Sequence, residues 1–222
     1  SPTSVTVFFA LVPKIAAMTV FIRFTNVAFS NIFDQWQLIL IFLSVGSMIL
    51  GAVAAIGQEN IKRLMAYSSI GHMGYALAGI LTGTIEGTKS TIIYLTIYAV
   101  MNVGIFACIF FMKRREKYVE DIKDLSGLSK TNPLLAVGFL IMLFSLAGIP
   151  PLAGFFAKFY IFVAVLDSKL YLLAVIGLVT TVISAFYYLR IVRIIYFDES
   201  KISFQNVKNF PLKFVLLTSS LI

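Results

Sequence analysis

Three ionisable side chains lie inside long apolar stretches of the sequence. Lys14, His72 and Lys158 each have mainly apolar neighbours on both sides. Placing a lysine at the centre of a bilayer costs roughly 2.5–3.5 kcal/mol, so such residues usually mark a proton or ion pathway. Histidine changes its charge near neutral pH, which suits a proton relay. We therefore predict proton transfer along these three residues; the alternative is that each is a paired or hydrogen-bonded structural residue.

Lys158 follows a segment that cannot remain helical. Gly148, Pro150, Pro151 and Gly154 all precede it closely. Proline removes a backbone donor, and broken membrane helices are tolerated only against protein or water. The freed ends of such helices bind ions or line hydrated cavities. We predict a helix break here with Lys158 beside it; the alternative is a kinked helix with an interfacial lysine.

Lys14 follows Pro13, which removes a helix donor and predicts an opened turn where water can enter. Burial disfavours the charged form of a lysine. Two charges about 10 Å apart interact by about 1.7 kcal/mol at an effective dielectric constant of about 20. Charging Lys14 would therefore help to discharge Lys158. This predicts proton translocation by electrostatic handover, driven by an external energy source.

His72 shares one side of its predicted helix with Ser68, Ser69 and Tyr75, which predicts a polar stripe. Small residues in the same segment, Gly71 and Gly74, permit close helix packing. Another helix face carries three polar residues that either hold water or pack helices, namely Tyr94, Tyr98 and Asn102.

The composition identifies the class of protein that must hold these residues. Of the 222 residues, 59% are hydrophobic and 13% charged, and the mean hydropathy is +0.95. Soluble domains have roughly 25% charged residues. One cysteine and one histidine exclude a disulfide framework and a Cys/His zinc site. With no phosphate-binding loop, metal cluster or Ser/His/Asp set, we expect no cofactor, metal or redox centre in this chain.

Six apolar stretches are long enough to cross a bilayer, which needs roughly 20 residues. They predict an all-α polytopic membrane protein with a single transmembrane domain over residues 1–222. Residues 214–222 would begin a seventh span. The six stretches are residues 2–24, 38–57, 64–82, 91–112, 134–166 and 170–189.

The basic residues predict the orientation. If the side holding residues 60–63 is called inside, only Arg23, Lys89 and Lys169 lie outside, which satisfies the positive-inside rule. Residues 113–132 form an inside-facing loop, and their alternating charges predict a short helix lying along the membrane. Their basic run then reflects topology and lipid contact rather than nucleic-acid binding. We interpret Glu59 as part of an anchoring ion cluster with its basic neighbours Lys62 and Arg63; the alternative is a role in proton entry.

Two motifs carry a resemblance to a known family. Residues 60–75 contain NIKR and YSSIGHMGY, and residues 148–159 read GIPPLAGFFAKF. They resemble the antiporter-like subunits of proton-pumping NADH:quinone oxidoreductase (respiratory complex I), and residues 1–4 and 13–16 fit as well. Lys158 followed by Phe159 is similar to the subunit 2 branch, called subunit N in bacteria.

The resemblance implies the second half of a fourteen-helix fold, with helices 8 to 13 and the start of helix 14. It also implies that Lys14 bridges two half-channels, His72 lies on the connecting polar axis and Lys158 faces the outside exit. The implied partners are the missing N-terminal half, other membrane-arm subunits and lipid. NADH, FMN, iron–sulfur clusters and quinone would be bound by partner subunits. The implied location is the bacterial cell inner membrane or the mitochondrial inner membrane.

Two other functions remain open from the sequence. A multi-subunit cation/proton antiporter or membrane-bound hydrogenase shares the implied fold and would have a different set of partners. A structural subunit that has lost pumping is disfavoured because both Lys14 and Lys158 are present. Because the chain begins at Ser1 and stops within an apolar run, we interpret it as a piece of a longer protein or a split-gene product.

Overall fold

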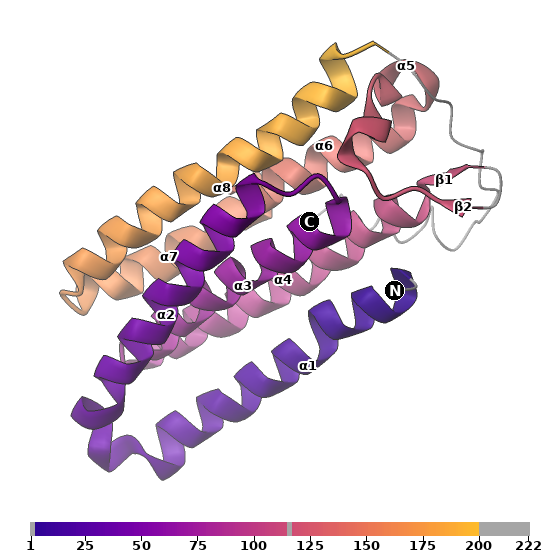
Figure 1. The fold of residues 1–222 in the computed structure, drawn as a ribbon. Helices are drawn as coiled ribbons and strands as arrows, with labels where there is room; N and C mark the ends of the chain where they lie inside the picture. The colour runs from indigo at the N-terminus through magenta and orange to yellow at the C-terminus, as the bar shows by residue number, and fades with distance from the viewer. Residues whose placement is uncertain (1–2, 115–116, 200–222) are drawn as a thin grey trace.

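A computed structural model describes residues 3–114 and 117–199, which form long helices lying side by side (Figure 1). A π turn (Phe24–Ala28) and a 3-10 turn (Ser30–Ile32) connect the first two helices. The long helices are α1 (Thr3–Arg23), α2 (Phe33–Ile56), α3 (Ile61–Ile80), α4 (Ile85–Phe110), α6 (Pro133–Ala147), α7 (Ala153–Asp167) and α8 (Tyr171–Phe197).

The helices have the dimensions and surface of membrane spans. Four segments are long and apolar enough to cross a bilayer: Val5–Ala28, Phe33–Ile56, Ile85–Phe110 and Tyr171–Phe197. In the described residues, the other two predicted spans correspond to the more polar α3 and to the pair α6 and α7, each 15 residues long. The prediction of an all-α polytopic membrane protein is confirmed, and residues 214–222 lie outside the described residues.

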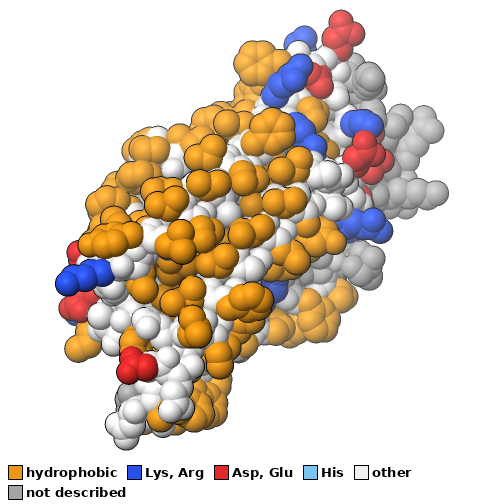
Figure 2. Space-filling view, turned by 60° about the vertical axis from the view of Figure 1, so that its left-hand side comes forward, with side chains coloured by type: hydrophobic (Ala, Val, Ile, Leu, Met, Phe, Trp, Pro, Cys, Tyr) orange, Lys and Arg blue, Asp and Glu red, His pale blue; other side chains and the backbone are white. Residues whose placement is uncertain are grey.

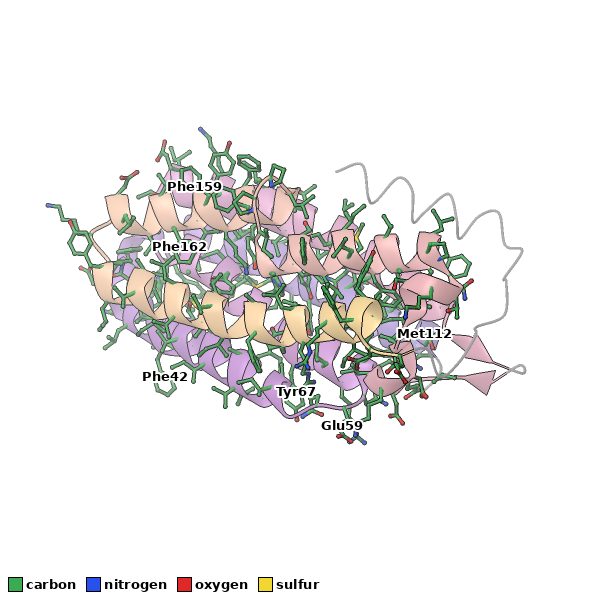
Figure 3. All side chains as sticks on the ribbon, turned by 90° about the horizontal axis from the view of Figure 1, so that it is seen from above. Phe42, Glu59, Tyr67, Met112, Phe159 and Phe162 are labelled. Atoms are coloured by element: carbon green, nitrogen blue, oxygen red, sulfur yellow. The ribbon has the colours of Figure 1, made fainter. Side chains whose placement is uncertain are left out.

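The face shown in Figure 2 is largely covered by apolar side chains, and most of its charged side chains lie towards its two ends. Phe42 and Phe159, which point away from the helices in Figure 3, are 77% and 49% exposed. So large an apolar surface is expected where helices face lipid or a further protein segment.

The predicted helix break is confirmed. α6 ends at Ala147, and Gly148 follows it with a φ of 85°. This left-handed conformation is strained for any residue with a Cβ, so glycine suits the position. The Pro150–Pro151 peptide bond is cis, and α7 begins at Ala153.

Pro13 leaves α1 continuous, so the opened turn that we predicted does not end the helix. α1 starts at the end of the molecule that carries β1 and β2 (Figure 1), and it packs against α3 and α4.

Residues 113–132 do not form the surface helix that we predicted. They contain β1 (Lys113–Arg114) paired with β2 (Lys117–Tyr118), a 3-10 turn (Ile122–Leu125) and the four-residue α5 (Leu128–Thr131). Backbone groups near Glu120 bond to the start of α3 rather than to each other, and Gly127 has a φ of 65°. Local charge alternation does not reveal such long-range pairing.

α2 and α3 pack closely against each other, as Gly71 and Gly74 predicted. A side chain at Gly51 would collide with the backbone of Gly71, and one at Gly74 would lie 2.9 Å from the carbonyl oxygen of Ser44. Small residues let helix backbones approach closely in a membrane. This contact fixes the face of α3 that carries His72.

Candidate functional site

Lys158 is held at the helix break by the end of the preceding helix. Its Nζ donates to the carbonyl oxygens of Leu146 and Ala147, at 3.2 and 3.1 Å. Carbonyl groups in the last turn of a helix have no partner within the helix and carry the negative end of its dipole. The residue is only 4% exposed, so α6 supplies polar partners that the apolar surroundings lack.

The opposite side of the break is closed by Ser145, whose Oγ accepts a bond from the backbone N–H of Gly154 at 3.1 Å. A Cβ on Gly154 would overlap the backbone of Ser145. The break is therefore tightly packed. Gly148 is needed for its positive φ, and Gly154 is needed because its backbone lies against that of Ser145.

Lys158 also faces an aromatic ring. Its Nζ lies 5.3 Å from the ring centroid of Tyr75 on α3. The Tyr75 hydroxyl bonds to α8, at 3.0 Å from the Thr180 hydroxyl and 2.8 Å from the Thr181 hydroxyl. Lys158 therefore reaches α3 through a cation–π contact, and Tyr75 continues the polar arrangement to α8.

His72 lies between two tyrosine hydroxyls and is 4% exposed. Its Nδ1 is 2.6 Å from the Tyr94 hydroxyl on α4, and its Nε2 is 3.3 Å from the Tyr188 hydroxyl on α8. The Tyr188 hydroxyl also bonds to Ser68. A neutral imidazole donates from one nitrogen and accepts at the other, so it can pass a proton between two such neighbours.

Lys14, on α1, contacts α3 one turn before His72. Its Nζ donates to the hydroxyl of Ser69, which donates to the carbonyl oxygen of Ala66 at 2.6 Å. Within the described residues, neither Lys14 nor Lys158 has a carboxylate partner. The alternative in which a carboxylate neutralises Lys14 therefore finds no support in these residues.

The three predicted residues converge on α3 without touching one another directly. Lys14 approaches through Ser69, and Lys158 approaches through Tyr75. The sequence-predicted polar stripe on α3 therefore joins the two lysines, although Ser68 bonds to Tyr188 rather than to His72.

Sequence reasoning missed the contribution of α8. Tyr188 is fully buried and bonds to both Ser68 and His72. A detectable signal was the spacing of Gly177, Thr180, Ser184 and Tyr188 by three or four residues, which gives an apolar helix one polar face. Of the other polar face noted above, Tyr94 meets His72, whereas Asn102 donates to the Tyr98 carbonyl oxygen on its own helix.

The ion pairs at the other end of α3 differ from the predicted cluster. Glu59 pairs with Lys123 at 3.0 Å, and Lys62 pairs with Glu120 at 2.7 Å. The partners, Glu120 and Lys123, belong to residues 113–132. They are too far away in the sequence for the pairing to have been predicted. No group of three histidine, cysteine, aspartate or glutamate side chains is placed to hold a metal in the described ranges.

Comparison with known proteins identifies the family to which this arrangement belongs. Residues 1–184 match the family described as "NADH:quinone oxidoreductase/Mrp antiporter, TM". The chain therefore belongs to this family of membrane proteins.

Two bacterial relatives are both named NADH-quinone oxidoreductase subunit N. The one from Pelagibacter ubique is 61% identical over 100% of this chain and 47% of its own length. The one from Parvibaculum lavamentivorans is 57% identical over 90% of this chain and 41% of its own length. The chain thus spans about half the length of the curated relatives it matches, in agreement with the expectation of a longer protein.

Two solved structures share the fold. A chain of the Mrp complex from Dietzia sp. has a TM-score of 0.82 and 27% identity, covering 89% of this chain and 36% of its own. A chain of respiratory complex I from Thermus thermophilus with bound NADH has a TM-score of 0.75 and 26% identity, covering 85% of this chain and 40% of its own. The antiporter-like fold expected from the motifs is confirmed.

Proposed function

We propose that the chain is the C-terminal part of a proton-translocating membrane subunit of NADH:quinone oxidoreductase. The observation that carries this proposal is the polar arrangement around α3, which joins the buried Lys158 at a helix break to His72 and Lys14. The name shared by the relatives of high identity supports the choice of complex. Because those relatives are bacterial, its location would be the bacterial inner membrane.

In this proposal Lys14, His72 and Lys158 are the proton-carrying residues. A proton on Lys14 passes by way of Ser69 and internal water to His72, which releases one from its other side towards Lys158. The carbonyl oxygens of α6 hold Lys158 when it is charged. When a second charge arrives nearby, repulsion favours release of the Lys158 proton towards the outside.

The energy for this cycle comes from elsewhere in the assembly. We infer that partner subunits bind NADH, FMN, iron–sulfur clusters and quinone, and that this chain contacts other membrane-arm subunits, lipid and the remaining half of its own subunit. The residues of this chain then supply only the positions at which protons are held and moved.

The alternative is a subunit of a multi-subunit cation/proton antiporter, which the fold similarity to the Mrp complex favours. A tagged copy of the full-length subunit distinguishes the two. After mild solubilisation, we expect it to co-migrate on a native gel with a very large band that stains for NADH dehydrogenase activity. Migration only in a smaller band without that activity would contradict the respiratory proposal and support the antiporter.

A further inference from the structure

A second charged group lies at the inside end of α3, away from the three residues discussed above. The Nζ of Lys62 is 2.7 Å from Oε1 of Glu120, and Nδ2 of Asn60 donates to Oε2 of Glu120 at 2.9 Å. The Lys62 side chain is 8% exposed, whereas that of Glu120 is 37% exposed. The pair therefore has one member in water and one buried in the protein.

Other contacts already attach the loop to α3, so attachment does not account for the burial of Lys62. The backbone N–H of Ile61 donates to the carbonyl oxygen of Glu120, and that of Ile122 donates to the carbonyl oxygen of Glu59, both at 2.9 Å. The exposed pair of Glu59, which is labelled in Figure 3, and Lys123 joins the same segments, with side chains 74% and 78% exposed. Burial removes hydration from the Lys62 charge, which offsets part of its attraction to Glu120.

Lys62 lies on the face of α3 that also contacts Lys14. Lys62 and Ser69 are seven residues apart on α3, which places them on the same face, about 10.5 Å apart along the helix axis. Ser69 is the residue that accepts the hydrogen bond from Lys14. The inside end of the face that receives Lys14 is thus occupied by a lysine connected to water through a carboxylate.

The facing side of α1 also ends in a buried polar group. Thr3, Val7, Ala10 and Lys14 recur at the spacing of one helix face. Thr3 is 3% exposed, and its hydroxyl has no hydrogen-bond partner among the described residues. Buried polar groups of this kind usually bind ordered water. Between Thr3 and Lys14 this face carries Val7 and the buried Ala10, whose side chain is only a methyl group.

We propose that Glu120 and Lys62 form the inlet through which protons from the inside solution reach Lys14. This inference rests on the proposed function. The Lys62 ammonium breaks one N–H bond and gives a proton to a water chain between α1 and α3, which forms one N–H bond on Lys14 after Lys14 has passed on its own proton. The Glu120 carboxylate takes up a proton from the inside solution and passes it to the amine of Lys62, which restores the ion pair. The net result is the transfer of one proton and one positive charge.

The test uses the full-length subunit within the assembled complex in inverted membrane vesicles. Glu120→Gln and Lys62→Met each remove one relay group, and Glu59→Gln removes the exposed pair as the matched control. Proton transfer by a positioned group contributes roughly 10²–10⁴-fold, so we expect NADH-driven proton uptake to fall at least about tenfold in the two inlet variants. The control should retain the unaltered rate.

A second readout separates a proton inlet from a structural contact. Imidazole at millimolar concentration can carry protons to a blocked inlet, so it should raise the NADH oxidation rate of Glu120→Gln while leaving Glu59→Gln unchanged. Uptake at the control rate in Glu120→Gln and Lys62→Met would overturn the inlet, as would a slow Glu120→Gln complex of normal size on which imidazole has no effect. Undiminished pumping in Lys158→Met would instead contradict the proposed function itself.

Discussion

Lys158 reaches back across the helix break, and its Nζ donates to the carbonyl oxygen of Ala147 at 3.1 Å. The amine is thus bound to the helix that precedes the break while its backbone belongs to the helix that follows. The charge on Lys158 and the geometry of the break are therefore linked, because loss of the proton removes one of the donors that hold α7 against α6.

Gly148 should be required for this link. Gly148→Ala places a Cβ 3.1 Å from Cδ of Lys158 at a φ of 85°, and a left-handed conformation costs roughly 1–2 kcal/mol for a residue with a Cβ. We expect a lower unfolding temperature in detergent and slower proton uptake. Gly46→Ala is the control, because nothing lies within 4 Å of its Cβ position; equal effects of the two substitutions would contradict this account.

The two tyrosine hydroxyls that bond to His72 should affect proton uptake more than an exposed tyrosine hydroxyl does. Tyr94→Phe and Tyr188→Phe each remove one bond to the imidazole while leaving the ring that fills the core. If His72 relays protons, each should slow proton uptake by roughly tenfold or more, with the complex still assembled. Tyr171→Phe, at a 60% exposed residue, should have no effect. A normal rate in both core variants would reduce His72 to a structural residue.

Acid should loosen the contact between residues 119–122 and α3. Hydrogen bonds from Lys62 and Asn60 hold the pKa of Glu120 below its ordinary value of 4.5. A lowered folded-state pKa contributes stability that is complete above the ordinary value and disappears as pH falls through the folded value. The amide exchange rate of Ile61 and Ile122, divided by the intrinsic rate at each pH, should therefore be unchanged between pH 8 and about 5 and should rise at lower pH. In Glu120→Gln this rise should be absent.

The sequence predicted the parts of the site whose residue types are costly in a membrane. Two prolines between two glycines located the break, and Lys14 and Lys158 stood out as charges within spans. Hydrophobic length also defined the six spans, although the helices extend beyond the apolar stretches. α2, for example, begins at Phe33 rather than residue 38, because helical bonding continues into the polar interface.

The rest of the site depends on contacts between distant segments. Nothing near Lys158 in the sequence indicates that carbonyl oxygens of α6 would accept hydrogen bonds from its amine. Nothing near Lys62 identifies Glu120, 58 residues away, as its partner. The same limitation explains the incorrect surface helix over residues 113–132, whose backbone groups near Glu120 pair with α3. Tyr188 was overlooked because tyrosine is common in apolar helices and its role depends on packing against His72.

The most direct test of the account is proton translocation by the complex that carries Lys158→Met in the full-length subunit. Methionine keeps the length and volume of the side chain but cannot hold a proton. We predict fewer protons translocated per NADH oxidised in inverted vesicles, with a complex of normal size on a native gel. Lys89→Met, at an exposed lysine of α4, should leave the ratio unchanged. An unaltered ratio in Lys158→Met would contradict the central claim that this chain carries protons across the membrane.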